Sequence, residues 1–295
     1  MTTTSNSPLA PPRPSPSTLR VRRLAKSQDG SGQSVGTTSD GVAYTWGPKN
    51  SLGQLGRPSG DEPSREPHTA QFVDPNDDST KLVDNVQVSR AYAGGNSEAG
   101  HTAVIDTNGH LWLSGSDRWQ QLGLVKVTSI DANLGATGYT WEGLWKERFH
   151  KNIYVTKLLQ EVSGGDGKIR DVAIGGDHTL VLSANRKDVI AFGKGGEGQL
   201  GLTGKPWVSA PVRSKELSSK RENIAAVCAV NHCSLTLGDD GQVLTSVGKC
   251  SKRMSEGFAR ALQYCQKKAE REGLLTSSIN VEGSNADEKS RLNLS

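Results

Sequence analysis

Three kinds of residue in this sequence could carry chemistry: a glycine-rich turn, a set of recurring histidines and four cysteines. In the turn, Gly193, Gly195 and Gly198 have the spacing G-x-G-x-x-G and follow a strand-like run at 189–192. This spacing cradles a pyrophosphate when a helix begins at the glycines. The next ten residues, LTGKPWVSAP, contain two prolines and no apolar spacing of three and four. A dinucleotide site is therefore not predicted.

The same layout occurs elsewhere in the chain. Residues 44–56 read YTWGPKNSLGQLG, and residues 111–123 read LWLSGSDRWQQLG. A fourth copy, LTSVGKC at 244–250, reaches Gly248 and stops before a G-Q-L-G turn. Repetition indicates that the glycines form a turn that recurs with each structural unit.

A polar residue stands 14 to 16 positions before the first glycine of each turn. The pairs are Gln33 and Gly47, His101 and Gly115, His178 and Gly193, and His232 and Gly248. Catalytic groups converge on one site, whereas these residues occupy one equivalent place in each repeat. We therefore expect the histidines and glycines to be structural. Each imidazole would bridge backbone groups of neighbouring strands through its two ring nitrogens.

The residues between each polar position and its glycine predict a β-hairpin. Runs of alternating apolar and polar residues flank Asp40-Gly41, Asn108-Gly109 and Asp240-Gly241. These dipeptides tolerate the positive φ angles of a type I′ turn. The third copy has ANRKD at 184–188 instead and needs a longer loop.

This composite motif resembles the repeat of the regulator of chromosome condensation family over about residues 32–248. The resemblance implies an all-β, propeller-like fold in which each repeat contributes strands to one blade. Family propellers have seven blades, whereas this chain has four hairpins and three complete turns. The sequence therefore predicts an array of about four repeats at 31–250, followed by a short C-terminal helix.

The cysteines give no sign of a metal centre. Cys228, Cys233, Cys250 and Cys265 form no C-x-x-C pair and fit no common zinc spacing. We expect reduced thiols, and neither a metal nor a cofactor.

The positive charge is concentrated at the N-terminus. The chain has 35 basic and 31 acidic residues, and the first 30 residues hold five basic residues and one acidic residue. The remainder is balanced, so general nucleic-acid binding is not expected. No apolar run is long enough for a membrane-spanning helix.

The composition of residues 1–30, rich in Ser, Thr, Pro and Arg, fits two alternatives equally well. Residues 1–28 could be a transit peptide, which would place the protein in mitochondria or another organelle. They could equally be a disordered basic arm of a cytoplasmic or nuclear protein, and a nuclear-import patch is a third reading.

An insert at about 124–170 interrupts the repeats and is rich in aromatic residues. Its candidate binding residues for a protein partner are Tyr139, Trp141, Trp145, Arg148 and Phe149. Aromatic and arginine side chains are common anchors of protein interfaces. The alternative is that these rings cover an exposed blade edge.

A helix is expected at 255–273, within a C-terminal segment at 251–275. Ser255 can cap its start and Gly273 can end it. Its apolar side chains fall on one face: Phe258, Ala261, Leu262, Cys265 and Ala269. The helix could cover the last blade or bind a partner. Residues 276–295 are polar and are expected to be disordered.

We expect a non-catalytic protein-interaction or regulatory module. The alternatives are a guanine-nucleotide exchange factor for a small GTPase and a truncated product of a larger propeller protein. Four repeats leave two terminal sheet faces, because each blade buries its faces against neighbours. Ring closure, self-association or covering by the helix could bury these faces. We favour the helix.

Overall fold

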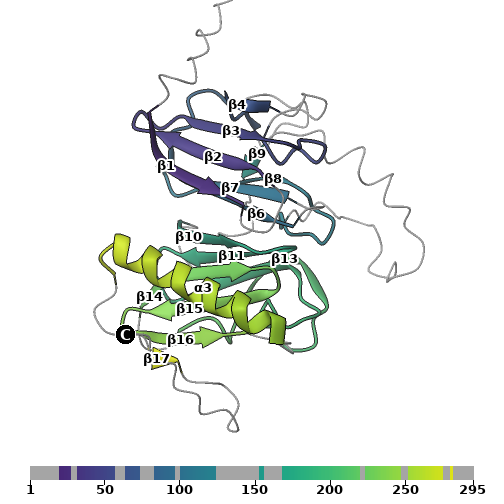
Figure 1. Ribbon diagram of the computed structural model, residues 1–295, viewed down its shortest axis with the longest axis vertical. Coiled ribbons are helices and arrows are strands. Elements are labelled where there is room, and N and C mark those ends of the chain that lie inside the picture. The colour runs from purple at the N-terminus through teal and green to yellow at the C-terminus, as the bar shows by residue number, and fades with distance from the viewer. Residues whose placement is uncertain are drawn as a thin grey trace, which may run out of the picture.

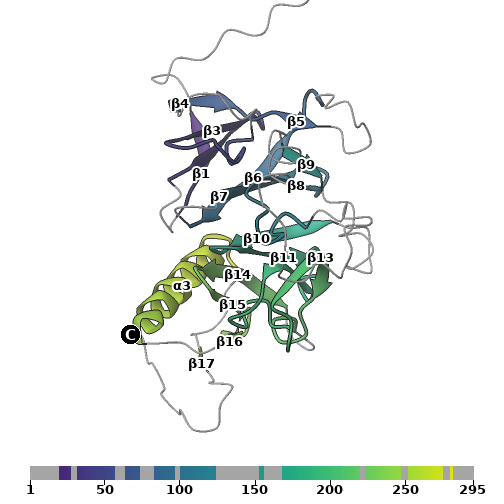
Figure 2. The same ribbon diagram turned by 90° about the vertical axis from the view of Figure 1, so that its right-hand side faces the viewer.

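The computed structural model describes residues 20–27, 32–56, 64–73, 83–96, 100–123, 153–155, 168–219, 223–246, 252–274 and 280–281. These residues form four sheets and one long helix, and we call the sheets blades one to four in chain order. The blades follow one another along the molecule, and helix α3 (Lys252–Arg271) lies against the fourth (Figures 1 and 2). The predicted all-β, propeller-like fold is confirmed.

Blades one and two contain the N-terminal strands. Blade one has the order β1 (Val21–Lys26), β2 (Ser34–Thr38), β3 (Ala43–Gly47) and β4 (Ser64–Thr69). Blade two has the order β5 (Phe72–Val73), β9 (Ile153–Val155), β8 (Leu111–Gly115), β7 (Gly100–Asp106) and β6 (Val88–Gly95).

Blades three and four repeat the same plan. Blade three contains β10 (Ile169–Ile174), β11 (His178–Ser183), β12 (Val189–Lys194) and β13 (Trp207–Arg213). Blade four contains β14 (Ile224–Val230), β15 (Cys233–Gly238), β16 (Gln242–Thr245) and β17 (Asn280–Val281). Neighbouring strands are antiparallel except for the parallel pairs β5–β9 and β16–β17.

Three strands lie in segments that the sequence assigned to other roles. β1 lies within the N-terminal segment and pairs with β2, so propeller structure begins before residue 31. β9 lies within the insert and forms an outer strand of blade two. β17 lies in the tail that we expected to be disordered, and it pairs with β16. Each strand has weak local signals and depends on a partner strand for its hydrogen bonds.

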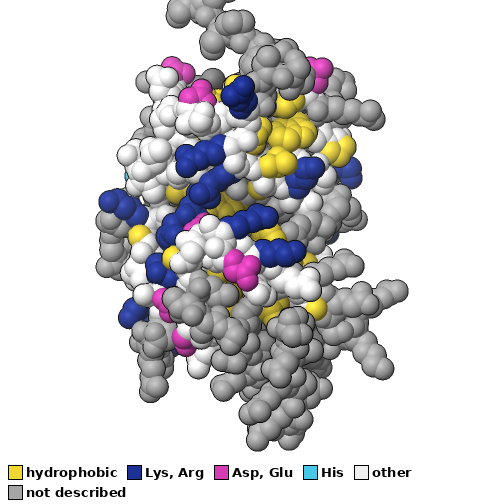
Figure 3. Space-filling model, turned by 60° about the vertical axis from the view of Figure 1, so that its left-hand side comes forward, with side chains coloured by type: hydrophobic (Ala, Val, Ile, Leu, Met, Phe, Trp, Pro, Cys, Tyr) yellow, Lys and Arg dark blue, Asp and Glu magenta, His cyan; other side chains and the backbone are white. Residues whose placement is uncertain are grey.

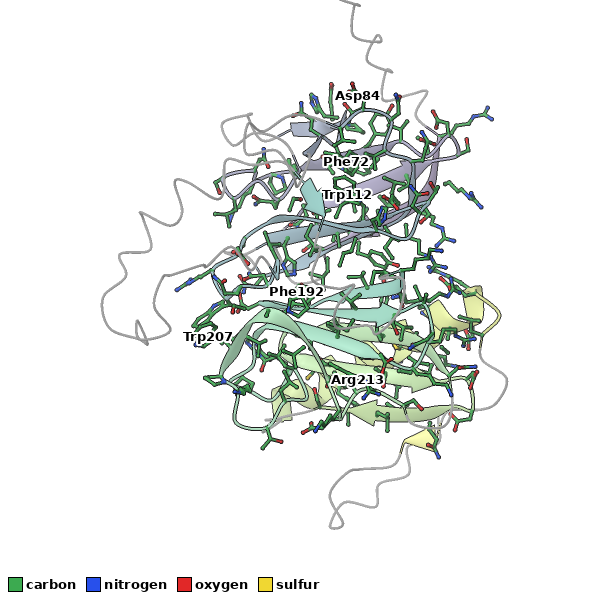
Figure 4. The ribbon with its side chains drawn as sticks, turned by 180° about the vertical axis from the view of Figure 1, so that it is seen from behind. Phe72, Asp84, Trp112, Phe192, Trp207 and Arg213 are labelled. Atoms are coloured by element: carbon green, nitrogen blue, oxygen red, sulfur yellow. A yellow bond between two sulfur atoms is a disulfide. The ribbon has the colours of Figure 1, made fainter. Side chains whose placement is uncertain are left out.

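The core consists of apolar layers between successive blades. In blade three, alternate side chains of β11 face opposite neighbours: Val181 packs with blade two, whereas Leu180 and Leu182 pack with blade four. Phe192 is fully buried in the layer between blades two and three (Figure 4). Both faces of an inner blade are therefore buried, which explains why its strands contain continuous apolar runs.

The layer between blades one and two is smaller and contains an aromatic pair. The rings of Phe72 and Trp112 meet edge to face with centroids 5.1 Å apart, in the upper part of Figure 4. Val35, Ala43 and Val104 complete this layer.

The hairpin turns differ from the predicted type I′. Gly41, Gly109 and Gly241 have positive φ angles of 78°, 86° and 84°, but the residue before each glycine does not. A type I turn followed by a left-handed glycine fits this pattern. The third hairpin has the longer loop that the sequence predicts, with Arg186 at a φ of 59°.

The glycine-rich stretch that contains Gly193, Gly195 and Gly198 is a turn between β12 and β13. The amide of Gly195 donates to the carbonyl of Pro206 over 2.7 Å, and no helix begins there. Gly193 has a φ of 105°, and a Cβ at this position would come within 2.6 Å of the carbonyl oxygen of Asp177. Only glycine fits such a contact without rearrangement.

The glutamine and leucine of each G-Q-L-G turn have fixed roles. The carbonyl oxygens of the Gln54, Gln121 and Gln199 side chains accept hydrogen bonds from backbone amides two residues earlier, at 2.7 to 3.0 Å. The following leucines are buried at Leu55, Leu122 and Leu200. The turn therefore supplies its own polar contacts and inserts one apolar side chain into the core.

Helix α3 covers the open face of blade four. Ala261, Leu262, Cys265 and Ala269 are buried against apolar side chains of β14 and β15, as the apolar stripe predicts. The helix begins at Lys252, three residues before the expected cap. It ends near Gly273, whose φ is 64°. The amide of Leu274 donates to the carbonyl of Ala269, a common way to end a helix.

The expectation that all cysteines are reduced is wrong for one pair. Cys228 on β14 and Cys265 on α3 form a disulfide across the helix–sheet interface, and their Cα atoms are 5.7 Å apart. Cys233 is buried and is a free thiol. No local pattern indicates this bond, because the two cysteines are 37 residues apart and meet only where the helix packs on the sheet.

Candidate protein-interaction surface

The aromatic residues predicted to bind a partner lie outside the described residues. This applies to Tyr139, Trp141, Trp145, Arg148 and Phe149, and their role stays a prediction. Gly248, the last repeat glycine, also lies outside. The other repeat positions can be followed in detail.

The histidines of the repeats connect one blade to the next. His101 Nε2 in blade two lies 3.0 Å from Thr179 Oγ1 in blade three. His178 Nε2 in blade three lies 2.7 Å from Ser234 Oγ in blade four. Both contacts reach a hydroxyl group of the following blade. The predicted bridges to backbone groups of neighbouring strands are therefore replaced by bonds between blades.

Gln33 makes the equivalent connection from blade one. Its Nε2 donates to the carbonyl oxygens of Gly94 and His101 in blade two, at 2.7 and 2.9 Å. Glutamine can replace histidine at this position because both side chains present an N–H donor at a similar reach.

The threonines that follow His101 and His178 connect in the opposite direction. Thr102 donates its hydroxyl proton to the carbonyl of Gln54 in blade one, and Thr179 donates to that of Gln121 in blade two. Because the single proton of Thr179 is used in this way, its oxygen accepts from His101, whose Nε2 must carry the hydrogen. Each His-Thr pair therefore joins three successive blades.

These histidines are poorly suited to proton transfer. His101 and His178 are fully buried. Burial, together with the nearby His232 and His101, lowers the pKa of His178 to about 3. A neutral imidazole held between two blades is a structural group.

One aromatic cluster is accessible on the side of the molecule that carries the turns. Lys194 Nζ lies 4.9 Å from the centre of the Trp119 ring, and the guanidinium of Arg118 lies 6.0 Å from it. Trp207 pairs with Lys194 across β12 and β13 and is 49% exposed. Its side chain projects from the edge of blade three (Figure 4). We call Arg118, Trp119, Lys194 and Trp207 the tryptophan surface.

Sequence reasoning missed the tryptophan surface. Its signal was Trp119, an aromatic residue at the turn position where the other two complete copies have Leu52 and Glu197. Trp207 follows the repeat motif, and its exposure depends on the position of β13 at the edge of its blade.

A cluster of charged and polar side chains joins α3 to the innermost strands of three blades. Lys268 Nζ lies 2.6 Å from Asp171 Oδ2 and donates to the carbonyls of Val172 and Val227, each at 3.2 Å. The hydroxyl of Tyr92 donates to the other oxygen of Asp171 over 2.8 Å. The carboxylate of Asp171 is therefore fully paired although it is buried.

Glu272 completes this region beyond the helix end. It forms ion pairs with Arg90 on β6 and with Arg170 on β10, the latter at 2.8 Å. Burial alone would raise the pKa of Glu272, but the hydrogen bond from Arg90 and the positive charges of Arg90, Arg170 and Lys268 bring that pKa below its ordinary value. The end of the helix is thus attached to blades two and three as well as to blade four.

The described residues contain no group of three or more histidine, cysteine or acidic side chains placed to hold a metal ion. No described helix is long and apolar enough to span a membrane.

Comparisons with known proteins agree with the fold and the repeats. No family model matches the chain. Protein RCC2 homolog of Danio rerio is 26% identical over 234 residues, which cover 79% of this chain and 44% of that protein. The X-linked retinitis pigmentosa GTPase regulator of Canis lupus familiaris is 29% identical over 143 residues, covering 48% of this chain and 12% of that protein.

Among solved structures, human WBSCR16 superimposes with a TM-score of 0.54 at 20% identity, covering 77% of this chain and 48% of that one. The chain spans less than half the length of the relatives and the structure compared above. These comparisons confirm the resemblance to the regulator of chromosome condensation family and its propeller fold.

Proposed function

We propose that this chain is a non-catalytic protein-interaction module that presents the tryptophan surface on a rigid propeller scaffold. Tryptophan and arginine are among the residues that contribute most binding energy in protein interfaces. Trp207, at 49% exposure beside the Lys194–Trp119 pair, is the observation that carries the proposal.

The polar groups of the repeats support a non-catalytic role. His101, His178 and Thr179 are buried and hydrogen-bonded between blades, so they are withdrawn from solvent and from any substrate. The scaffold fixes the surface above it, because the turns carrying Trp119 and Lys194 are held by their own glutamines and leucines.

A partner that is a small GTPase is the second candidate. Its support is the likeness to a protein named as a GTPase regulator, which covers about half of this chain. Exchange activity would require the bound surface to loosen nucleotide in the GTPase as well as to hold it.

The test mixes the purified chain with a panel of purified small GTPases loaded with a fluorescent guanine nucleotide. Binding is measured by biolayer interferometry, and nucleotide release is measured by loss of fluorescence. A GTPase that binds without faster release supports the interaction module. Faster release would replace it with the exchange-factor function.

The matched variants are Trp207→Ala and Val212→Ala, both on β13. Val212 is 39% exposed but lies outside the tryptophan surface. We expect Trp207→Ala to weaken binding by about 2 kcal/mol and Val212→Ala to leave it nearly unchanged. Equal effects of the two substitutions, or no effect of Trp207→Ala, would contradict the proposed surface.

A further inference from the structure

A cavity of about 300 Å³ lies where the innermost strands of the four blades approach helix α3. Residues from β1, β6, β10 and β14 form its walls, and Tyr264 and Arg271 of the helix close it on the remaining side. The cavity is far from the tryptophan surface in sequence and is built from different elements.

The walls of the cavity combine an apolar floor with uncompensated positive charge. Ala93, Val172 and Ile174 line the floor, and Tyr264 at the rim is 41% exposed. Lys26 and Arg271 are exposed at the rim and form no ion pair with any described residue. In Figure 3, Lys and Arg side chains gather on this side of the molecule around patches of hydrophobic surface.

Two acidic groups beside the cavity are already neutralised. Asp171 is paired with Lys268, and Glu272 is paired with Arg90 and Arg170. The charge of Lys26 and Arg271 is therefore not cancelled by these carboxylates. Arg22 and Arg23 extend the positive charge along β1.

Strand β1 also offers backbone groups. It stands at the end of its sheet and is hydrogen-bonded to β2 along one edge. Residues 24–27 line the cavity. An edge strand presents alternating N–H and C=O groups to which an extended peptide can add.

We propose that the groove formed by β1, the cavity and Tyr264 and Arg271 of α3 binds an extended acidic segment of a partner protein. Carboxylates of that segment pair with Lys26 and Arg271, an apolar side chain enters the cavity beside Tyr264, and its backbone aligns with β1. The observations favour peptide over nucleic acid, because the cavity is small and is lined by only two cations, whereas a nucleic-acid site needs cations along many phosphates.

The probe is a fluorescein-labelled ten-residue peptide of alternating glutamate and leucine. Its binding to the full chain is measured by fluorescence anisotropy. Two comparison probes are used. One is the same peptide with glutamine in place of glutamate, and the other is a labelled ten-nucleotide oligothymidine. We expect the acidic peptide to bind more tightly than both. Tighter binding of the oligothymidine, or equal binding of the glutamine peptide, would overturn the proposal.

The variants are Lys26→Glu with Arg271→Glu, and Lys215→Glu as the control. Lys215 is an exposed lysine outside the groove. We expect the double variant to weaken peptide binding by at least about tenfold and Lys215→Glu to change it by less than about twofold. Equal losses would mean that the peptide follows overall charge and would contradict a defined groove.

A third variant separates the groove from charge alone. Tyr264→Ala removes the aromatic wall and keeps both cations, so we expect weaker binding with an unchanged dependence on salt. Unchanged binding would contradict insertion of an apolar side chain. Trp207→Ala leaves this groove intact and should not change peptide binding. The proposed roles of the tryptophan surface and of the groove can therefore be tested separately.

Discussion

At the scale of single residues, the polar side chains of each repeat form hydrogen bonds with the neighbouring blade. His101 and His178 each contact a hydroxyl of the following blade, and Gln33 donates to its backbone. The opposing glycine allows this arrangement, because His101 pairs with Gly115 and His178 with Gly193 across the hairpin.

The burial of His178 makes stability depend on pH. Its pKa is about 3 in the folded chain and about 6.5 when unfolded, so the unfolded chain binds more protons between these values. The contribution of His178 to stability is complete above about pH 6.5 and falls as the pH decreases towards 3. At about pH 5 the loss is on the order of 2 kcal/mol.

His178→Gln tests this prediction, because glutamine occupies the same repeat position at Gln33. We expect His178→Gln to retain an interblade hydrogen bond and to flatten the decrease in stability between pH 6.5 and 5. His178→Ala should lose about 2 kcal/mol at pH 7 by removing the bond and leaving a cavity. Urea denaturation at several pH values measures both. If the free energy of unfolding of His178→Gln fell with decreasing pH as steeply as that of the native chain, His178 would not be the group responsible.

Gln120 is in a conformation that favours glycine. Its φ is 64°, and the equivalent turn positions are Gly53 and Gly198, with φ angles of 69° and 85°. We expect Gln120→Gly to raise the free energy of unfolding by about 1 kcal/mol, and Gly198→Ala to lower it by a similar amount. Thermal unfolding of both variants gives the comparison. A destabilised Gln120→Gly would show that the glutamine side chain outweighs its backbone strain.

At the scale of elements, helix α3 is held to the blades by three kinds of contact. Its apolar stripe packs on β14 and β15, a disulfide joins it to β14, and Lys268 and the adjoining Glu272 reach strands of blades two and three. Each can be removed separately.

Removing Lys268 leaves a buried carboxylate without its cation. The side chain of Asp171 is 5% exposed, so we expect Lys268→Ala to lower the free energy of unfolding by about 3 kcal/mol. Lys267→Ala, on the exposed side of the same helix, is the control and should change it by less than about 0.5 kcal/mol. Chemical denaturation distinguishes them. Equal small effects would mean that the ion pair contributes little.

The disulfide closes a loop of 37 residues between β14 and α3. Constraining a loop of this size is expected to stabilise the fold by about 2–4 kcal/mol. Cys228→Ser with Cys265→Ser should therefore lower the melting temperature, and a reducing agent should lower that of the native chain but not that of the double variant. A native chain insensitive to reductant would contradict the bond.

The sequence predicted the elements whose signals are local and missed those that depend on distant partners. The hairpins follow from alternating residues around Asn108-Gly109, and the helix follows from the spacing of its apolar residues. β1 was missed because VRRLAK follows a proline-rich, basic segment and forms a strand only against β2. The groove was missed because it brings Lys26 and Arg271 together from opposite ends of the chain, and the pairing of Asp171 with Lys268 has no local pattern.

At the scale of the whole molecule, the fourth blade ends the array in a particular way. His232 occupies the place of His101 and His178, and among the described residues no blade follows the fourth to offer it a hydroxyl group. Helix α3 instead packs its apolar face on β14 and β15. The helix therefore supplies apolar packing where a further blade would otherwise stand.

Deleting residues 254–295 should expose the apolar face that α3 covers. We expect aggregation or a marked fall in melting temperature, and Phe258→Asp should act in the same direction because Phe258 packs against this cluster. Size-exclusion chromatography and thermal unfolding provide the measurements. A truncated chain that stays monomeric and equally stable would contradict the covering role.

The contacts between blades run in a fixed direction, with each histidine or glutamine reaching forward and each threonine reaching back. Neighbouring blades therefore share bonds, whereas blades further apart share few. Under a pulling force applied at the two ends, such an assembly would extend in steps, one interface rupturing at a time.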